Sequence, residues 1–264
     1  MKVKGDGIFS INTSSTSFGS GGISLPEAVV ESGGGGDNPP ITTGLELFIN
    51  VEAEVYSDTG STLAEDGDNI RQINDQSGNG NTLEQATASS QFVYTADALG
   101  TGNFGLFKAA AADHMDFAST LSIAGPNSSF TFYTVYDKTN LSAISYLFGT
   151  TDGNFNRILE YANSTIYIQD ADGDTHFATI TNAGDLAIRT FTLDTSTDTI
   201  STYINGSLVN SSSSSKTWGD FNFDNFWGGA VVGYIGNTLL YSELHDATQV
   251  AQVSDWLNDK YSIY

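Results

Sequence analysis

The carboxylates near the start of the chain are the first residues whose types could do chemistry. Glycoside hydrolysis needs two carboxyl groups across the scissile bond, about 5–5.5 Å apart in retaining enzymes. Glu46, Glu52 and Glu54 are close in sequence, and Glu52 and Glu54 would share one face of a strand. No predicted strand carries a full Glu-x-Asp-x-x-Glu pattern, and the acidic run 65–68 has the composition of a loop. A glucanase is therefore the weakest of the functions we consider.

Histidine and cysteine chemistry have little support in the sequence. The three histidines are His114, His176 and His245, and none lies in a Gly-x-Ser-x-Gly or similar nucleophile motif. We interpret them as ordinary strand or loop residues. The chain has no cysteine, which excludes thiol catalysis, disulfides and cysteine-bound zinc. We predict that the protein is not an enzyme.

Two polar clusters have the oxygen ligands that calcium prefers. Asp170, Asp172 and Asp174 occupy alternating positions between two predicted strands. They lack the downstream Glu of an EF-hand loop, so a plain hairpin turn is the favoured interpretation. A second candidate on the same terms comprises Asp75, Asn79 and Asn81. Calcium is the one cofactor that the sequence leaves open, and no other is predicted.

The densest aromatic stretch of the chain spans residues 218–227. It holds five rings in ten residues, interleaved with Asp and Asn. Sugar binding needs a stacking ring beside amide or carboxylate groups, and this stretch contains both. Phe221 and Phe223 are two residues apart, so we expect both to face the core of a strand layer. The rings nearer to turn signals are predicted to contact a glycan: Trp218, Phe226 and Trp227.

The charge of the chain excludes several partners. Nine Lys and Arg stand against 31 Asp and Glu, which gives a net charge of −22 over 264 residues. Binding to nucleic acid needs clustered cations that displace counterions, and the same sign disfavours anionic membrane surfaces. No apolar run is long enough for a membrane span, and the start of the chain lacks the apolar segment of a secretory signal. We predict neither nucleic acid nor membrane as a partner.

Strands must position most of these residues. The strand-like segments are 131–136, 164–169, 176–180, 190–194, 199–204, 207–209, 231–236 and 238–241. Between two of them, Asn205 and Gly206 favour a type I′ turn, which requires positive φ at both central residues. Short strands at spacings of 8–12 residues predict an all-β sandwich or barrel.

One helix is predicted at the C-terminal end. Asp246 can cap it, and Gln249 three residues later completes a capping box. Lys260 falls in the last turn, where a cation suits the helix dipole. The apolar residues expected on one face are Val250, Val253, Leu257 and Tyr261.

The N-terminal residues differ in composition from the rest. Residues 32–41 contain four consecutive glycines and two prolines, which is typical of a flexible tether with a stiff end. Residues 1–31 cannot bury a core alone, so we interpret them as an anchoring arm, with a disordered tail as the alternative. We divide the chain into arm (1–31), linker (32–41) and globular domain (42–264). The candidate anchoring residues are Ile8, Phe9, Ile11 and Phe18.

Several landmarks in order along residues 44–264 carry a family resemblance. They are the segments 70–81, 85–92, 113–117, 130–135, 203–206 and 233–244, followed by the helix. Together they resemble concanavalin A-like, laminin-G-like jelly rolls, although Asn74 stands where that family usually has Trp. The resemblance implies a two-sheet antiparallel jelly-roll sandwich, with the C-terminal helix against the sandwich or over an edge. The arm has no counterpart in the family.

These observations lead to two main hypotheses of function. The first is a non-enzymatic virion surface protein that resembles bacteriophage head-decoration or fibre proteins. Its arm would bind a capsid or other virion protein by adding a strand to a sheet edge, and its lectin-like domain would face outward toward cell-surface or mucus glycans. A homo-oligomer, a trimer, is expected. The second is an extracellular or cell-surface bacterial carbohydrate-binding module.

Overall fold

The structure is a computed structural model. It describes residues 38–100, 102–110, 113–123, 129–138, 145–149, 156–161, 165–170, 175–179, 186–213, 215, 218–229 and 232–264. The predicted arm (1–31) and residues 32–37 of the predicted linker lie outside them. The anchoring residues Ile8, Phe9, Ile11 and Phe18 therefore have no structural description, and the division of the chain stays a prediction.

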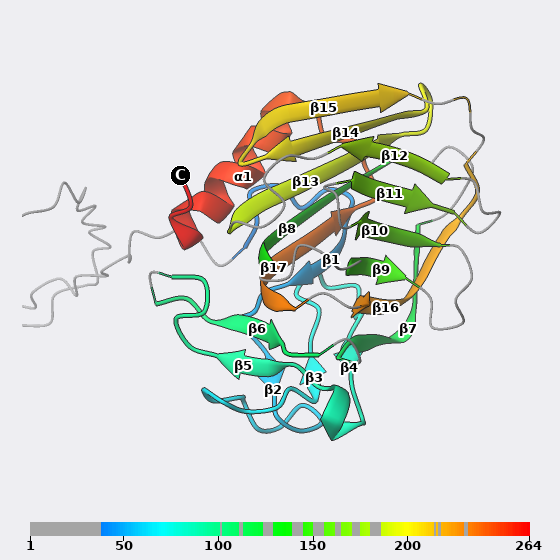
Figure 1. The fold of residues 1–264 in the computed structure, drawn as a ribbon. Helices are drawn as coiled ribbons and strands as arrows, with labels where there is room; N and C mark the ends of the chain where they lie inside the picture. Colours follow the sequence, from blue (N-terminus) through cyan, green and yellow to red (C-terminus); the bar gives the residue numbers. More distant parts are fainter. Residues whose placement is uncertain are drawn as a thin grey trace, which may run out of the picture.

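Two antiparallel sheets form the body of the described chain (Figure 1). Sheet A has the strand order β15-β14-β13-β8-β17-β6-β5, and β1 also pairs with β17. Sheet B has the order β12-β11-β10-β9-β16-β7-β4-β3-β2. Strands distant in sequence become neighbours, so that β17 lies between β6 and β8, and β16 between β7 and β9. The predicted all-β, two-sheet antiparallel sandwich is confirmed.

The elements have the following bounds. Sheet A contains β1 (Leu45–Ile49), β5 (Val93–Thr95), β6 (Gly105–Lys108), β8 (Phe130–Lys138), β13 (Ala187–Asp194), β14 (Thr199–Ile204), β15 (Ser207–Ser213) and β17 (Gly233–Tyr241). Sheet B contains β2 (Val55–Tyr56), β3 (Gln72–Ile73), β4 (Leu83–Glu84), β7 (Met115–Ile123), β9 (Ser145–Gly149), β10 (Arg157–Tyr161), β11 (Thr165–Gln169), β12 (Thr175–Thr179) and β16 (Phe221–Gly229). A short 3-10 helix covers Ala88–Ser90, and the α-helix α1 covers Ala247–Tyr261.

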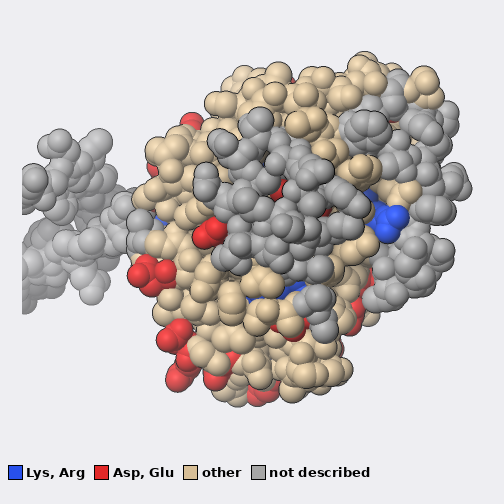
Figure 2. Space-filling model, in the orientation of Figure 1, with Lys and Arg blue, Asp and Glu red and all other residues tan. Residues whose placement is uncertain are grey.

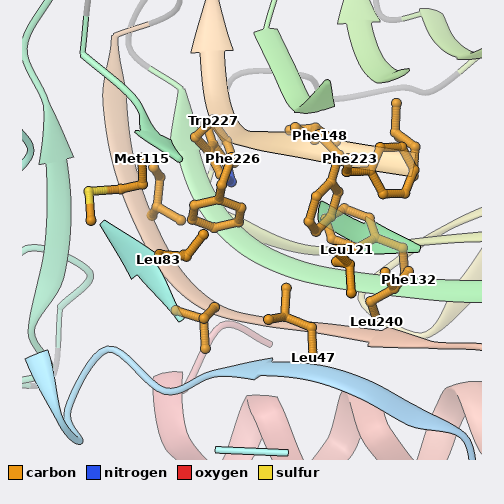
Figure 3. Packing of buried hydrophobic residues seen from close by; sticks show 14 of the residues in the cluster. Leu47, Leu83, Met115, Leu121, Phe132, Phe148, Phe223, Phe226, Trp227 and Leu240 are labelled. Carbon is orange, nitrogen blue, oxygen red and sulfur yellow. The ribbon is translucent and has the colours of Figure 1, made fainter. Parts of the chain in front are cut away.

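The core between the sheets follows from the two-residue period of the strands. On β8, Phe132 points toward sheet B, whereas its neighbour Tyr133 points away from it. Figure 3 shows Phe132 near Phe148 and Phe223 of sheet B, and the Phe132 and Phe148 rings meet edge to face at 5.0 Å. Full burial of such a ring contributes about 1.5–3 kcal/mol. This apolar layer therefore holds the two sheets together.

A second apolar layer lies on the other side of sheet A, where α1 packs. The four residues predicted to share one helix face are all buried, and Trp256 joins them with its ring 5.8 Å from Phe48. Asp246 caps the helix and forms a capping box with Gln249, as predicted. Lys260 lies in the last turn. The helix thus covers the outer face of sheet A, not an edge.

The hairpin between β14 and β15 also matches its prediction. Asn205 and Gly206 have φ values of 50° and 74°, the positive values that a type I′ turn requires. The predicted strands 231–236 and 238–241 are instead one strand, β17, and this is a correction. The pairing of β17 with β8 shifts register between Ile235 and Thr238, and this irregularity accounts for the apparent break in the sequence pattern.

The loop that carries the family landmark is fixed by one carboxylate. Asp75 accepts hydrogen bonds from the backbone N–H groups of Phe48 (2.9 Å), Ser77 (2.8 Å) and Asn81 (3.1 Å). The Asn74 side chain donates to Glu54 at 2.9 Å near the surface. This loop therefore docks on β1 through Asp75, independently of the residue at position 74.

Candidate functional site

The three rings predicted to contact a glycan lie in the core, which contradicts that prediction. Trp218, Phe226 and Trp227 are at most 2% exposed. Phe226 and Trp227 lie on β16, a central strand of sheet B, and Trp227 packs edge to face on Tyr136 of sheet A at 5.0 Å. Trp227 has a φ of 54°, so the backbone irregularity turns its side chain inward. Phe221 and Phe223 face the core as predicted.

The predicted calcium ligands that the structure describes already form hydrogen bonds within the protein. Asp170 is buried and accepts a hydrogen bond from the backbone N–H of Gly219 at 2.8 Å. Asp172 and Asp174 lie outside the described residues. The side-chain amides of Asn79 and Asn81 donate to the backbone carbonyls of Leu45 and Glu46, both in β1. No group of three or more acidic, histidine or cysteine side chains in the described ranges is arranged to hold a metal.

The carboxylates considered for hydrolysis are held in separate structural contacts. Glu46 accepts a hydrogen bond from the Ser242 hydroxyl at 2.7 Å, and Glu52 lies 2.8 Å from the Lys260 ammonium. Glu54 has a φ of 55° and lies between β1 and β2, so it does not share a strand face with Glu52. The acidic run 65–68 forms a loop as expected.

The histidines also occupy different environments. His114 Nε2 lies 3.5 Å from Asp116 Oδ2 at the start of β7, and both side chains are partly exposed. His245 is buried under α1. The His176 side chain lies outside the described part of the structure.

The outer face of sheet B, turned away from sheet A, carries polar side chains beside the ring of Tyr146, and the ring of Tyr167 on β11 lies on the same face. Ile158 and Ile166 face the core, so the alternate residues on β10 and β11 face outward. We call the resulting cluster the Tyr146 patch. It comprises Asp116 of β7, Tyr146 of β9, Arg157 of β10, Gln169 of β11 and Asn225 of β16.

Strand pairing and hydrogen bonds position the members of the Tyr146 patch. Arg157 and Gln169 are direct partners across β10 and β11, and Arg157 Nε donates to Gln169 Oε1 at 2.7 Å. The Arg157 guanidinium carbon lies 5.8 Å from the centre of the Tyr146 ring. Asn225 is paired with Asp116, with its amide nitrogen 3.4 Å from Asp116 Oδ1. Four adjacent strands therefore contribute to one outward-facing cluster, and Gln169 extends it to a fifth.

Two glycines, Gly149 and Gly228, lie beside Tyr146 and Asn225 on sheet B. Gly149 pairs with Asn225, and Gly228 pairs with Tyr146. A Cβ atom at Gly228 would lie 2.7 Å from Asn225 Oδ1, which is too close, and 3.8 Å from Tyr146 Cβ. At Gly149 a Cβ atom would lie 3.9 Å from Tyr146 Cβ and 4.0 Å from Arg157 Cβ. The glycines thus let the amide of Asn225 lie close to the ring.

The Tyr146 patch combines groups suited to bind a polar ring compound. Tyr146 is half-buried, so part of its ring is accessible for apolar contact. The partly exposed Asp116 and Arg157 side chains can accept and donate hydrogen bonds, respectively. The amides of Gln169 and Asn225 are buried and hold Arg157 and Asp116 in position. This mixture suits hydroxyl groups spaced around a saccharide.

Sequence reasoning missed the Tyr146 patch. The alternation in 164–169 was visible and placed Gln169 opposite the apolar residues. Nothing in the sequence showed that β16 pairs with both β7 and β9, and it is this pairing that brings Asn225 between Asp116 and Gly149. The aromatic density of 218–227 pointed instead to core residues.

The fold is a two-sheet antiparallel β-sandwich. No family model and no curated protein matches the sequence. Among solved structures, the binding domain of botulinum neurotoxin DC in complex with SialylT is similar, with a TM-score of 0.54 and 12% identity over 82% of this chain and 52% of that chain. The serotype G binding domain has a TM-score of 0.54 and 15% identity over 81% and 51%.

A smaller structure matches over nearly its whole length. Domain 4 of AbnA, a GH43 extracellular arabinanase from Geobacillus stearothermophilus, in complex with arabinotriose, has a TM-score of 0.50 and 15% identity, over 80% of this chain and 98% of that chain. The present chain spans about half the length of the neurotoxin binding domains. At 12–15% identity these similarities concern the fold alone. None of the helices in the described part of the chain has the length and apolar character needed to cross a membrane.

Proposed function

We propose that the chain is a carbohydrate-binding domain and that the saccharide lies on the Tyr146 patch. The observation that carries this proposal is the half-buried Tyr146 ring, with the Arg157 guanidinium near it and the partly exposed Asp116 carboxylate on the same face of sheet B. Sugar binding needs a stacking ring beside hydrogen-bonding groups. The Tyr146 patch offers both, at a different place in the fold from residues 218–227. The arabinotriose complex of an arabinanase domain with a similar fold supports the proposal.

The experiment compares variants of the ring. Tyr146→Ala should weaken binding about 10-fold, because a ring contact contributes about 0.5–1.5 kcal/mol beyond its buried area. Tyr146→Phe keeps the ring and should retain most of the affinity. A glycan array selects the ligand, and calorimetry measures the affinity of each variant. Tyr56→Ala, on β2 at the far edge of sheet B, is the matched control.

The proposal fails on either of two results. One is the absence of binding to every glycan on a broad array by the intact chain. The other is binding that Tyr146→Ala leaves unchanged while the variant keeps the wild-type thermal unfolding midpoint.

The proposed domain binds a saccharide without cleaving it. Glu46 and Glu52 are held by hydrogen-bonding or ionic partners at separate places, which supports a structural role for each. We expect no release of reducing sugar when the chain is incubated with a panel of β-glucans and arabinans. Measurable release would overturn this part of the proposal and favour the glucanase alternative.

Attachment to a virion is a more specific proposal than carbohydrate binding, and only the sequence supports it. The apolar residues of 1–31 and the Gly/Pro segment 32–41 suggest an arm that anchors the domain on a particle, with the Tyr146 patch outward. The neurotoxin and arabinanase domains described above are not virion proteins. Deleting residues 1–36 should abolish retention on particles, and undiminished retention would refute the attachment.

A further inference from the structure

Arg157 differs from the other described basic side chains. Four others are committed to partners inside the protein: Arg71 lies 3.8 Å from Glu84, Lys260 lies 2.8 Å from Glu52, Lys108 is buried and donates to backbone carbonyls, and Arg189 is buried over the Tyr136 ring. Among the basic side chains that the structure describes, only Arg157 both faces outward and lacks an acidic partner. This stands out in a chain whose net charge is −22.

The Arg157 side chain is held in place before any ligand arrives. Its Nε donates to Gln169 Oε1 at 2.7 Å, and Gln169 is itself buried. Its guanidinium lies over the Tyr146 ring at 5.8 Å. These contacts engage Nε and one face of the guanidinium, and they leave the two terminal Nη groups able to donate to a ligand. A guanidinium with two such donors matches the two oxygens of a carboxylate or sulfate.

We propose that Arg157 binds the carboxylate or sulfate of an acidic saccharide, and that this selects acidic over neutral sugars at the Tyr146 patch. The inference rests on the proposed carbohydrate-binding function and adds the class of ligand. The oxyanion accepts hydrogen bonds from the Arg157 Nη groups, while the sugar contacts the half-buried Tyr146 ring. Because the whole chain is strongly negative, a saccharide with one acidic group suits the patch better than a polyanion.

The test uses three probes that share a lactose core. They are lactose, 3′-sialyllactose, which carries a carboxylate, and lactose 3′-sulfate. The intact chain should bind at least one of the two acidic probes about 10-fold or more tightly than lactose, because hydrogen bonds between a guanidinium and an oxyanion are stronger than those between neutral groups. The acidic probe that binds more tightly identifies the oxyanion.

Three variants assign the selectivity to Arg157. Arg157→Gln should lose the preference for the acidic probe while keeping the affinity for lactose. Arg157→Lys should keep only part of the preference for the acidic probe, because an ammonium cannot donate two parallel hydrogen bonds to the two oxygens of an oxyanion. Arg71→Gln removes the same charge elsewhere on sheet B and should leave the preference intact. Thermal unfolding of each variant shows that it is folded.

The outcomes separate this inference from the function on which it rests. Equal binding of all three probes by the intact chain, or a preference that survives in Arg157→Gln, overturns the role of Arg157 and leaves carbohydrate binding standing. If the intact chain binds none of the probes and no other glycan, both proposals fall. A preference that disappears equally in Arg71→Gln reflects net charge and also overturns the inference.

Discussion

At the scale of single residues, His245 shows how burial sets chemistry. Its Nδ1 atom lies 2.8 Å from the Tyr133 hydroxyl, and its ring lies 4.3 Å from the centre of the Tyr241 ring. Desolvation lowers the pKa of His245 to about 4, although the nearby Asp246 carboxylate acts in the opposite direction. The imidazole is therefore neutral in the folded protein at physiological pH and acts as a packing residue.

This burial predicts a pH dependence of stability. Between pH 4 and 6.5 the unfolded chain binds a proton at His245 that the folded chain does not, so the contribution of His245 to the free energy of unfolding should rise with pH across this window. Burial raises the pKa of Glu160 to about 7, and this group contributes in the opposite direction, so the His245 part is read from the difference between the unchanged protein and a His245 variant. The His245 contribution is about 2 to 3 kcal/mol. Urea denaturation at pH 4.5, 5.5 and 7 measures it.

Two histidine variants isolate the effect. His245→Phe should remove this part of the pH dependence, whereas His114→Gln, at a partly exposed site, should not. An identical pH profile for His245→Phe and the unchanged protein would contradict the assignment.

At the scale of elements, the docking of α1 depends on how the helix begins. The Asp246 carboxylate accepts hydrogen bonds from the N–H groups of Thr248 (2.8 Å) and Gln249 (2.9 Å), and Gln249 returns a contact to the Asp246 N–H at 3.0 Å. These bonds satisfy N–H groups that have no partner within the helix. The cap therefore fixes the helix start directly after His245.

Removing the cap should destabilise the protein measurably. Asp246→Ala should cost about 1 kcal/mol, which corresponds to a decrease of about 2–4 °C in the unfolding midpoint of a chain of this size. Asp259→Ala removes the same charge from an exposed position near the other end of α1 and should cause little change or a slight gain. Equal losses in both variants would show that charge, not capping, matters.

At the scale of the whole molecule, the dominant feature is the excess of negative charge. In the view of Figure 2 the acidic side chains gather toward the lower left, on the side of β5 and β6, and basic side chains are few. Charges of one sign repel each other across the surface, and at 0.1 M dissolved salt largely screens the repulsion between charges more than about 10 Å apart. The folded state holds these charges closer together than the unfolded chain does.

Salt should therefore stabilise the protein. Raising NaCl from 10 to 300 mM should raise the unfolding midpoint by about 2–4 °C, the shift expected for a gain of about 1 kcal/mol. Differential scanning calorimetry measures the shift. A scan with the salt of a larger, weakly hydrated anion separates screening from specific ion effects. An unfolding midpoint that falls with NaCl would contradict the expectation.

The sequence predicted what local chemistry determines. The turn at Asn205 and the cap at Asp246 depend on residues next to them, and both appeared where expected. The Tyr146 patch depends on pairing between segments more than fifty residues apart, such as β16 with β9, which local patterns do not encode. The prediction that Trp227 lies at the surface is wrong, because its positive φ turns the side chain into the core. A positive φ within a strand cannot be predicted from a tryptophan in the sequence.

The position of α1 also gives the molecule a front and a back. The helix and the backbone near Ile41, whose carbonyl accepts a hydrogen bond from the Tyr241 hydroxyl, both lie against sheet A on the side away from sheet B. An affinity tag or a solid support joined after Tyr264 would therefore hold the protein by its rear surface. The Tyr146 ring would then face the solvent. A biosensor surface that carries the protein through its C-terminal end should therefore leave the Tyr146 patch accessible to ligand.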